Sequence, residues 1–153
     1  MPETRWLDDR ERHAWRGYLA MHAQLVAHLH RQLQHESGLS LADFDVLVQL
    51  TDRPEPRIRI GELRQALQWE KSRLSHHLGR MQRRGLVLRE DCPDDARGAY
   101  IVLTDQGRAA IEQAAPSHVD TVRELVFDAL TDDQVNALAT IADRILEKLN
   151  ETA

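Results

Sequence analysis

Residues Lys71 to Leu86 read KSRLSHHLGRMQRRGL, and this stretch decides how the rest of the chain is interpreted. It carries five basic side chains, two adjacent histidines and no acid. Leu74, Leu78 and Met81 recur at steps of four and three residues, which predicts a helix with one apolar face. Gly85 is the predicted end of this helix, because glycine commonly adopts the left-handed conformation that ends helices. Such a helix is either a solvated basic surface or a surface that meets phosphate groups.

Positive charge is concentrated around this helix. The segment from Arg53 to Arg108 holds 12 basic and 8 acidic residues, whereas the rest of the chain holds 8 basic and 17 acidic residues. Phosphate groups respond to local charge, so the formal net charge of -5 does not argue against a nucleic-acid partner. We therefore expect a basic, nucleic-acid-binding face on an acidic scaffold.

The length, composition and missing motifs of the chain limit the classes of protein to which it can belong. The chain has 153 residues, of which 42% are hydrophobic, enough for one domain with helical extensions. No run of 18 apolar residues and no secretory signal is present, and the one cysteine, Cys92, lies in a polar segment. We expect a cytoplasmic protein with an exposed loop thiol. Motifs of hydrolases, P-loop proteins, dinucleotide-binding proteins and zinc proteases are missing, so neither an enzyme nor a cofactor is expected.

The elements before the basic helix can be predicted from periodicity and end signals. A long amphipathic helix is expected from Asp9 to His35, closed by Gly38. Ser40 is the N-cap candidate of a second helix, which ends before the prolines at 54 and 56. A short strand at residues 57–60 and a short helix at residues 61–67 follow.

The elements after the basic helix complete the pattern. Strands at residues 86–90 and 99–103 form a hairpin, and Thr104 caps a helix running towards Leu130 with a kink or break at Pro116. Thr131 to Gln134 read TDDQ, a capping box before a final apolar stripe. The expected fold is mainly α with a small β-hairpin wing, that is, a winged helix-turn-helix lobe with a helical dimerisation region.

The segment from Ile60 through Gly107 resembles the DNA-binding core of MarR-type transcriptional regulators. The most specific part is the wing, Asp95-Ala96-Arg97 followed by the LTDQG stretch at residues 103–107. The resemblance implies a homodimer whose first and last two helices interlock. It places an N-terminal dimerisation helix at residues 1–38, the DNA-binding lobe at 39–108 and C-terminal dimerisation helices at 109–153.

The function implied is a sequence-specific regulator of transcription that binds double-stranded DNA. The resemblance favours a homodimeric repressor on a pseudo-palindromic operator, released by a small-molecule effector. Two alternatives stay open: a zinc-responsive regulator of the same fold, and a winged-helix module that binds protein without an effector.

The outward face of the basic helix is the predicted DNA contact. Arg73, near its N-terminus, is the candidate for bidentate contact with guanine, and Ser72 and His76 can add hydrogen bonds. Four further side chains are expected to contact phosphates without reading sequence, namely Lys71, His77, Arg80 and Arg84. The full predicted set is Lys71, Ser72, Arg73, Ser75, His76, His77, Arg80 and Arg84.

The resemblance also assigns roles in the wing. Arg97 resembles the family arginine that enters the minor groove, and Asp95 resembles the acid that orients it. Ala96 stands where relatives often have a second arginine, so weaker minor-groove binding is expected.

An effector, if present, is expected to be a small aromatic or anionic molecule in the crevice between the dimerisation region and the winged lobe. The candidate lining residues are Trp15, His22, Phe44 and Trp69, for each of which plain core packing is the alternative. No metal is expected: the histidines of the first helix point to different sides, and only His118 is present where zinc-binding relatives have a histidine pair. Peroxide sensing is not expected either, because Cys92 is not near the N-terminus.

Overall fold

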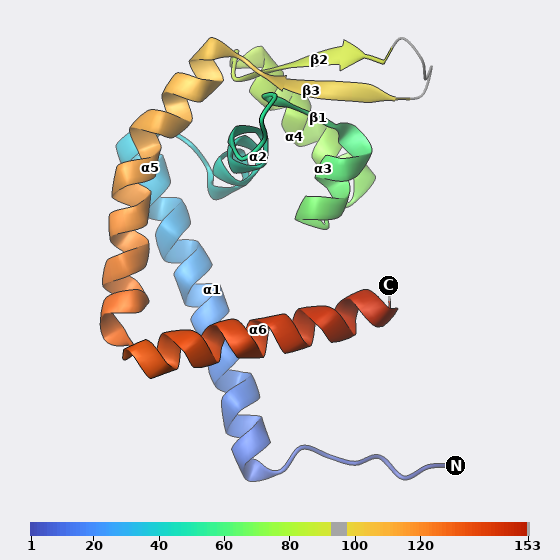
Figure 1. The fold of residues 1–153 in the computed structure, drawn as a ribbon, viewed down its shortest axis with the longest axis vertical. Helices are drawn as coiled ribbons and strands as arrows, with labels where there is room; N and C mark the ends of the chain where they lie inside the picture. The colour runs from blue at the N-terminus through green and yellow to red at the C-terminus, as the bar shows by residue number, and fades with distance from the viewer. Residues whose placement is uncertain (93–97, 153) are drawn as a thin grey trace. The chain divides into compact units, whose positions relative to one another are not determined.

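The computed structural model describes residues 1–92 and 98–152 (Figure 1). The predicted wing contacts Asp95 and Arg97 lie outside the described residues. Contacts divide the chain into two compact units, Met1–Pro116 and Ser117–Ala153. The elements, in chain order, are α1 (Asp9–Ser37), α2 (Leu41–Thr51), β1 (Arg57–Arg59), α3 (Ile60–Leu67), α4 (Lys71–Arg83), β2 (Val87–Asp91), β3 (Ala99–Leu103), α5 (Asp105–Leu125), a 3-10 helix (Phe127–Ala129) and α6 (Asp132–Thr152).

The junction of α1 and α2 has the end signals expected from the sequence. Gly38 follows α1 with φ of 71°, in the left-handed region that a glycine adopts without strain. Ser40 and Asp43 form a capping box: each backbone N–H donates to the other's side-chain oxygen at 2.9 Å. These bonds satisfy N–H groups at the start of α2 and place the Asp43 carboxylate against the core.

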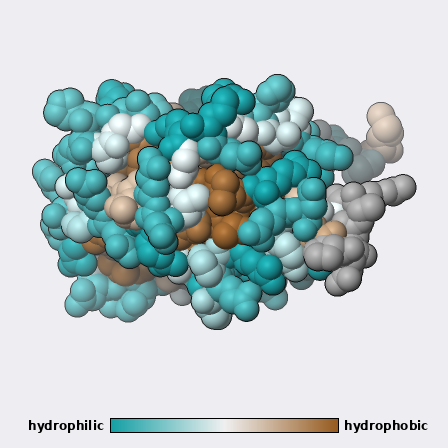
Figure 2. Space-filling view, turned by 90° about the horizontal axis from the view of Figure 1, so that it is seen from above, coloured by the Kyte–Doolittle hydropathy of each residue, from teal (hydrophilic) through white to brown (hydrophobic). Residues whose placement is uncertain are grey.

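The three strands form one antiparallel sheet in the order β1-β3-β2. Ile58 pairs with Ile101, and Val87 pairs with Leu103. Along β3 every second side chain is buried, so one face of the sheet covers the core. Figure 2 looks down on the end of the lobe that carries the sheet, where hydrophobic side chains gather at the centre and hydrophilic ones surround them. Half of Leu88 is exposed, so the outer face of the sheet is not purely polar.

A cap hydrogen bond and a close backbone contact fix the start of α5 against the sheet. The Gly107 N–H donates to Thr104 Oγ1 at 2.9 Å, which confirms the predicted cap. A Cβ at Gly107 would collide with the backbone oxygen of Leu86, so only glycine allows this close approach. The connection between wing and α5 is therefore fixed by residues 104 and 107.

The core of the winged lobe joins α1, α2, α3, α4, the sheet and the first half of α5. Leu74, Leu78 and Met81 are buried, which confirms the predicted apolar stripe of α4. Cys92 is also buried, so the expectation of an exposed thiol is wrong: its N–H pairs with the Gly98 carbonyl and draws the residue into the base of the wing.

Helix α5 ends earlier than predicted, and of the kink or break predicted at Pro116 the break does not occur. It continues through Pro116 without a break. Proline removes one N–H, whose partner would have been the carbonyl of Glu112; both residues are exposed, so water can satisfy that carbonyl. The helix then ends at Leu125 and a 3-10 turn follows, instead of continuing to Leu130.

Helix α6 begins at the predicted capping box. The Thr131 N–H donates to Gln134 Oε1 at 2.9 Å, and the Gln134 N–H donates to Thr131 Oγ1 at 3.2 Å. All residues of α6 are described, and none is buried. Its exposed apolar side chains are Leu138, Ile141, Ile145, Leu146 and Leu149.

Candidate nucleic-acid interface

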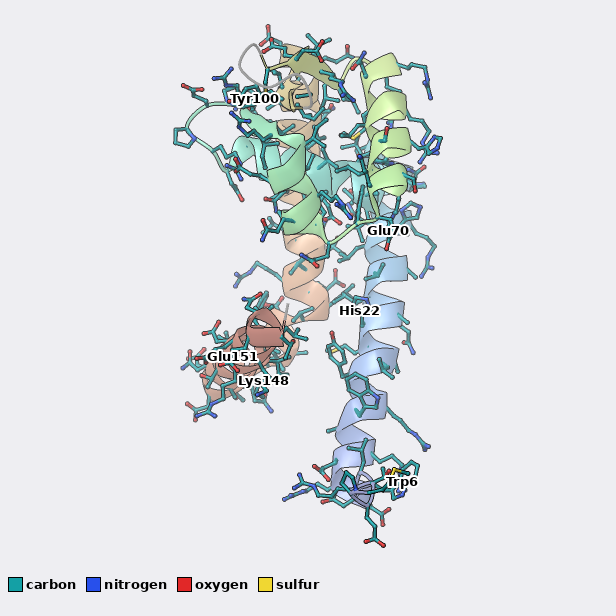
Figure 3. The ribbon with its side chains drawn as sticks, turned by 90° about the vertical axis from the view of Figure 1, so that its right-hand side faces the viewer. Trp6, His22, Glu70, Tyr100, Lys148 and Glu151 are labelled. Carbon is teal, nitrogen blue, oxygen red and sulfur yellow. The ribbon has the colours of Figure 1, made fainter. Side chains whose placement is uncertain are left out.

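The turn from α3 to α4 sets the direction in which α4, the basic helix, leaves α3. Gln68 has φ of 56°, a left-handed conformation unusual for a residue with a side chain, and its N–H bonds to the Arg64 carbonyl at 2.8 Å. Arg64 Nε in turn donates to the Trp69 carbonyl at 3.3 Å. Glu70 lies at the N-terminal end of α4, where Figure 3 labels it. The tight turn thus gives α4 a fixed direction as it leaves α3.

The inner side of α4 includes His77, and its predicted outward orientation is wrong. Only 8% of the residue is exposed, because it lies one turn beyond Leu74 on the same buried face. Its Nε2 lies 2.9 Å from Asp43 Oδ1, and its Nδ1 lies 3.3 Å from Arg80 Nη2. Each ring nitrogen therefore has a charged side chain beside it, the Asp43 carboxylate at Nε2 and the Arg80 guanidinium at Nδ1. His77 therefore holds α4 to α2 from within the lobe.

Asp43 is the centre of this connection. Arg84 donates to Asp43 Oδ2 at 2.7 Å and to the Gly38 carbonyl at 3.1 Å. Burial by itself would raise the pKa of Asp43, but hydrogen bonds from His77, Arg84 and Ser40 outweigh it and hold the pKa well below its usual value. Arg84 thus ties the end of α4 to the α1–α2 junction, and its predicted phosphate contact stays a prediction.

The outer side of α4 carries most of the predicted set. Lys71, Ser72, Arg73, Ser75, His76 and Arg80 are all exposed. Arg83 is exposed on the same side, because it follows Ser72, His76 and Gly79 at steps of four, three and four residues. The sequence interpretation passed over Arg83 in favour of its neighbour, although helical spacing from Ser72 indicates it.

Arg73 is exposed but not free in solution. Its guanidinium lies 4.2 Å from the centre of the Trp69 ring, within cation–π range. Trp69 meets His77 edge to face, with ring centres 5.4 Å apart. Burial raises the pKa of Asp45 on α2, and the positive charge of Arg73 partly opposes that shift, so carboxylate and guanidinium attract each other. Arg73 is thus held by the indole face and attracted by the Asp45 carboxylate.

A cleft of about 980 Å³ lies beside the outer face of α4, between α3, α4 and the sheet. Its described lining includes five basic side chains against one acid, Glu62, which pairs with Arg53 at 3.3 Å. Such a lining favours an anionic occupant. The basic residues are Arg59, Arg64, Lys71, Arg83 and Arg89, of which only Lys71 is in the predicted set.

The four predicted effector residues occupy three different environments. Half of Trp15 is exposed on α1, where it stacks on Tyr18, and Tyr18 in turn stacks on His22. Figure 3 labels His22 on this helix. Phe44 is part of the lobe core, and Trp69 lies in the turn before α4, partly buried against the edge of that core. The described chain does not bring the four together, and the effector crevice stays a prediction.

Metal-ligating side chains do not cluster in the part of the chain that the structure describes. No group of three or more histidine, cysteine, aspartate or glutamate side chains there is placed to hold a metal ion. His118 is partly buried, which lowers its pKa. No described helix is long and apolar enough to cross a membrane.

Known proteins resemble this chain over most of its length. The sequence pattern of the MarR family matches residues 37–98. A MarR family transcriptional regulator of Streptomyces coelicolor, solved in complex with DNA, is 41% identical; the match covers 97% of this chain and 93% of that one, with a TM-score of 0.92. AbsC, a MarR family regulator of the same organism, is 38% identical over 97% of this chain and 99% of its own, with a TM-score of 0.91. The HTH-type transcriptional repressor YetL of Bacillus subtilis is 27% identical over 74% of this chain and 67% of its own length.

Proposed function

The chain belongs to the MarR family of transcriptional regulators, and from this premise we propose that it binds double-stranded DNA in a sequence-specific way through the outer face of α4. The observation that carries the proposal is the division of α4 into two sides. Its apolar residues are buried in the lobe, whereas its exposed side chains are basic or polar and the helix contains no acid. A relative with 41% identity was solved in complex with DNA, which supports the same partner here.

Helix α4 has the dimensions and side chains to enter a major groove. Arg73 can donate two hydrogen bonds to one guanine, and Ser72, Ser75 and His76 can bond to neighbouring base edges or phosphates. Lys71 and Arg80 neutralise phosphates. The sugar–phosphate backbone then runs over the basic cleft beside α3 and the sheet. Asp95 and Arg97 keep their proposed minor-groove role.

We extend the proposal to a homodimer on a pseudo-palindromic operator. Apolar side chains are exposed along α1 and α6, including Leu19, Met21, Ile141 and Ile145. Large apolar side chains exposed on each of these helices favour a partner chain, and a two-fold axis would present two copies of α4 to two half-sites.

Repression and effector release complete the proposed function. The name of the relative YetL supports repression, in which the bound dimer blocks transcription. An effector would act by binding one spacing of the two α4 helices more tightly than another. The stacked row of Trp15, Tyr18 and His22 is a surface that an aromatic molecule could join.

The test is a selection of bound duplexes from a pool with a randomised centre, followed by affinity measurements with variants. Arg73→Ala should lose preference at one base pair of each half-site, equivalent to about 1–3 kcal/mol. Arg80→Ala should weaken binding to selected and scrambled duplexes alike. Arg144→Ala removes the same charge from exposed α6 and should change neither.

Recovery of unrelated sequences by the wild type would refute sequence-specific recognition. If Arg73→Ala and Arg80→Ala lowered affinity equally for every duplex, the two assigned roles would be wrong.

A further inference from the structure

We propose that Trp69, supported by His77, is a positioning residue that sets the sequence preference of Arg73. The inference rests on the proposed function, because it concerns how the DNA-reading arginine is held before DNA arrives. It follows from a continuous set of contacts that leads from a buried carboxylate to an exposed guanidinium.

The first contact is between Trp69 and Arg73. The guanidinium lies 4.2 Å from the centre of the indole ring. Trp69 is half-buried and packs against the lobe core, so the indole is a stable platform. Its backbone carbonyl accepts from Arg64 Nε at 3.3 Å, which also fixes the main chain at this point.

The second contact supports the indole from inside the lobe. His77 meets Trp69 edge to face at 90°, with ring centres 5.4 Å apart. The imidazole cannot turn freely, because Asp43 Oδ1 lies 2.9 Å from Nε2 and Arg80 Nη2 lies 3.3 Å from Nδ1. Asp43, His77, Trp69 and Arg73 therefore form one connected row.

Stacking on Trp69 is compatible with reading a base. A cation–π contact uses the face of the guanidinium, whereas hydrogen bonds to guanine use the N–H groups at its edge. Arg73 precedes His76 by three residues and Arg80 by seven, so it borders the outer face of α4. The negative charge of Asp45 on α2 also attracts the guanidinium. The arginine keeps its donors while losing rotational freedom.

The benefit is preorganisation. A flexible arginine loses side-chain entropy when it is immobilised on a base, and a side chain already held in place loses less. Because that saving applies only where Arg73 makes its bidentate contact, Trp69 should affect discrimination between sequences more than overall affinity.

The experiment is a double-mutant cycle with wild type, Trp69→Leu, Arg73→Ala and the double variant. The probes are a duplex selected by the wild type and the same duplex altered at the base pair that Arg73→Ala ceases to discriminate. Trp69→Leu should lower the ratio of the two affinities about threefold to tenfold, as expected from losing one cation–π contact. In the Arg73→Ala background the same change should lower the ratio no further.

Conservative variants separate positioning from packing. Trp69→Phe keeps an aromatic face and should retain part of the discrimination that Trp69→Leu loses. Trp6→Leu removes an exposed tryptophan before α1, where Figure 3 labels it, and should leave the ratio unchanged. Thermal unfolding of each variant identifies any that fails to fold; if Trp69→Leu does, the Phe variant alone must lower the ratio.

Two results would overturn the inference. One is an equal loss of affinity for both duplexes in the folded Trp69 variants; the other is a full effect of Trp69→Leu on the ratio when Arg73 is already alanine. Failure of the proposed function looks different, because the wild type itself would then prefer no duplex.

Discussion

The winged lobe and α6 treat their apolar side chains in opposite ways. Helix α4, with 13 residues, buries Leu74, His77, Leu78 and Met81. Helix α6, with 21 residues, has an apolar stripe just as regular and buries none of it. The lobe buries the apolar face of α4 in its own core, whereas the apolar stripe of α6 is exposed to solvent in this chain. This contrast supports the proposals that the lobe binds DNA and that the exposed stripe of α6 forms part of a dimer interface.

The largest expected effect comes from charging the stripe of α6. Ile141→Asp combined with Ile145→Asp would bury four carboxylates in a dimer interface, and the dimer dissociation constant should rise by about 10³ or more. Sedimentation equilibrium should show half the wild-type mass at concentrations where the wild type is dimeric. Thr140→Asp adds one negative charge on the other side of α6 and should leave the mass unchanged. A wild type that is monomeric would contradict the proposed dimer. A variant with both aspartates that remains dimeric would show that α6 is not part of the interface.

End signals of helices were predictable because they are local. Gly38, Ser40 and the Thr131–Gln134 capping box each act within a few residues of the helix that they end or begin. A kink or a break at Pro116 was predicted from a local rule about the lost hydrogen bond, and the helix continues without a break where the carbonyl left without a partner is exposed and accessible to water.

The inner side of α4 was not predictable in the same way. His77 and Arg84 both meet Asp43, and 41 residues separate Arg84 from that carboxylate. No local sequence pattern predicts a contact between residues so far apart in the chain. Arg83, in contrast, could have been found by following helical spacing from Ser72 across the whole helix. The cleft residues Arg59 and Arg89 required the fold, because separate strands bring them to α4.

A smaller effect tests the connection within the lobe. Asp43→Asn keeps the size of the side chain and removes its charge, and should lower the free energy of unfolding by about 2 kcal/mol at neutral pH. Urea unfolding measures the loss. Asp45→Asn on the same helix is the matched control and should cost less, because burial already raises the pKa of Asp45.

The low pKa of Asp43 predicts that the stability difference between wild type and Asp43→Asn depends on pH. The folded-state pKa of Asp43 lies below that of the unfolded chain, so its contribution is complete above about pH 4 and is lost as pH falls further. The difference between wild type and Asp43→Asn should therefore shrink between neutral pH and about pH 3. A constant difference over that range would show that the Asp43 charge does not stabilise the fold.

The central claim, that the basic outer face of α4 and its cleft meet DNA phosphates, is tested most directly by the salt dependence of duplex binding. For a dimer making about eight phosphate contacts, affinity for a selected duplex should fall by about 10³ or more between 50 and 200 mM salt, with log affinity linear in log salt. A binding constant that stays nearly constant over that range would contradict the account.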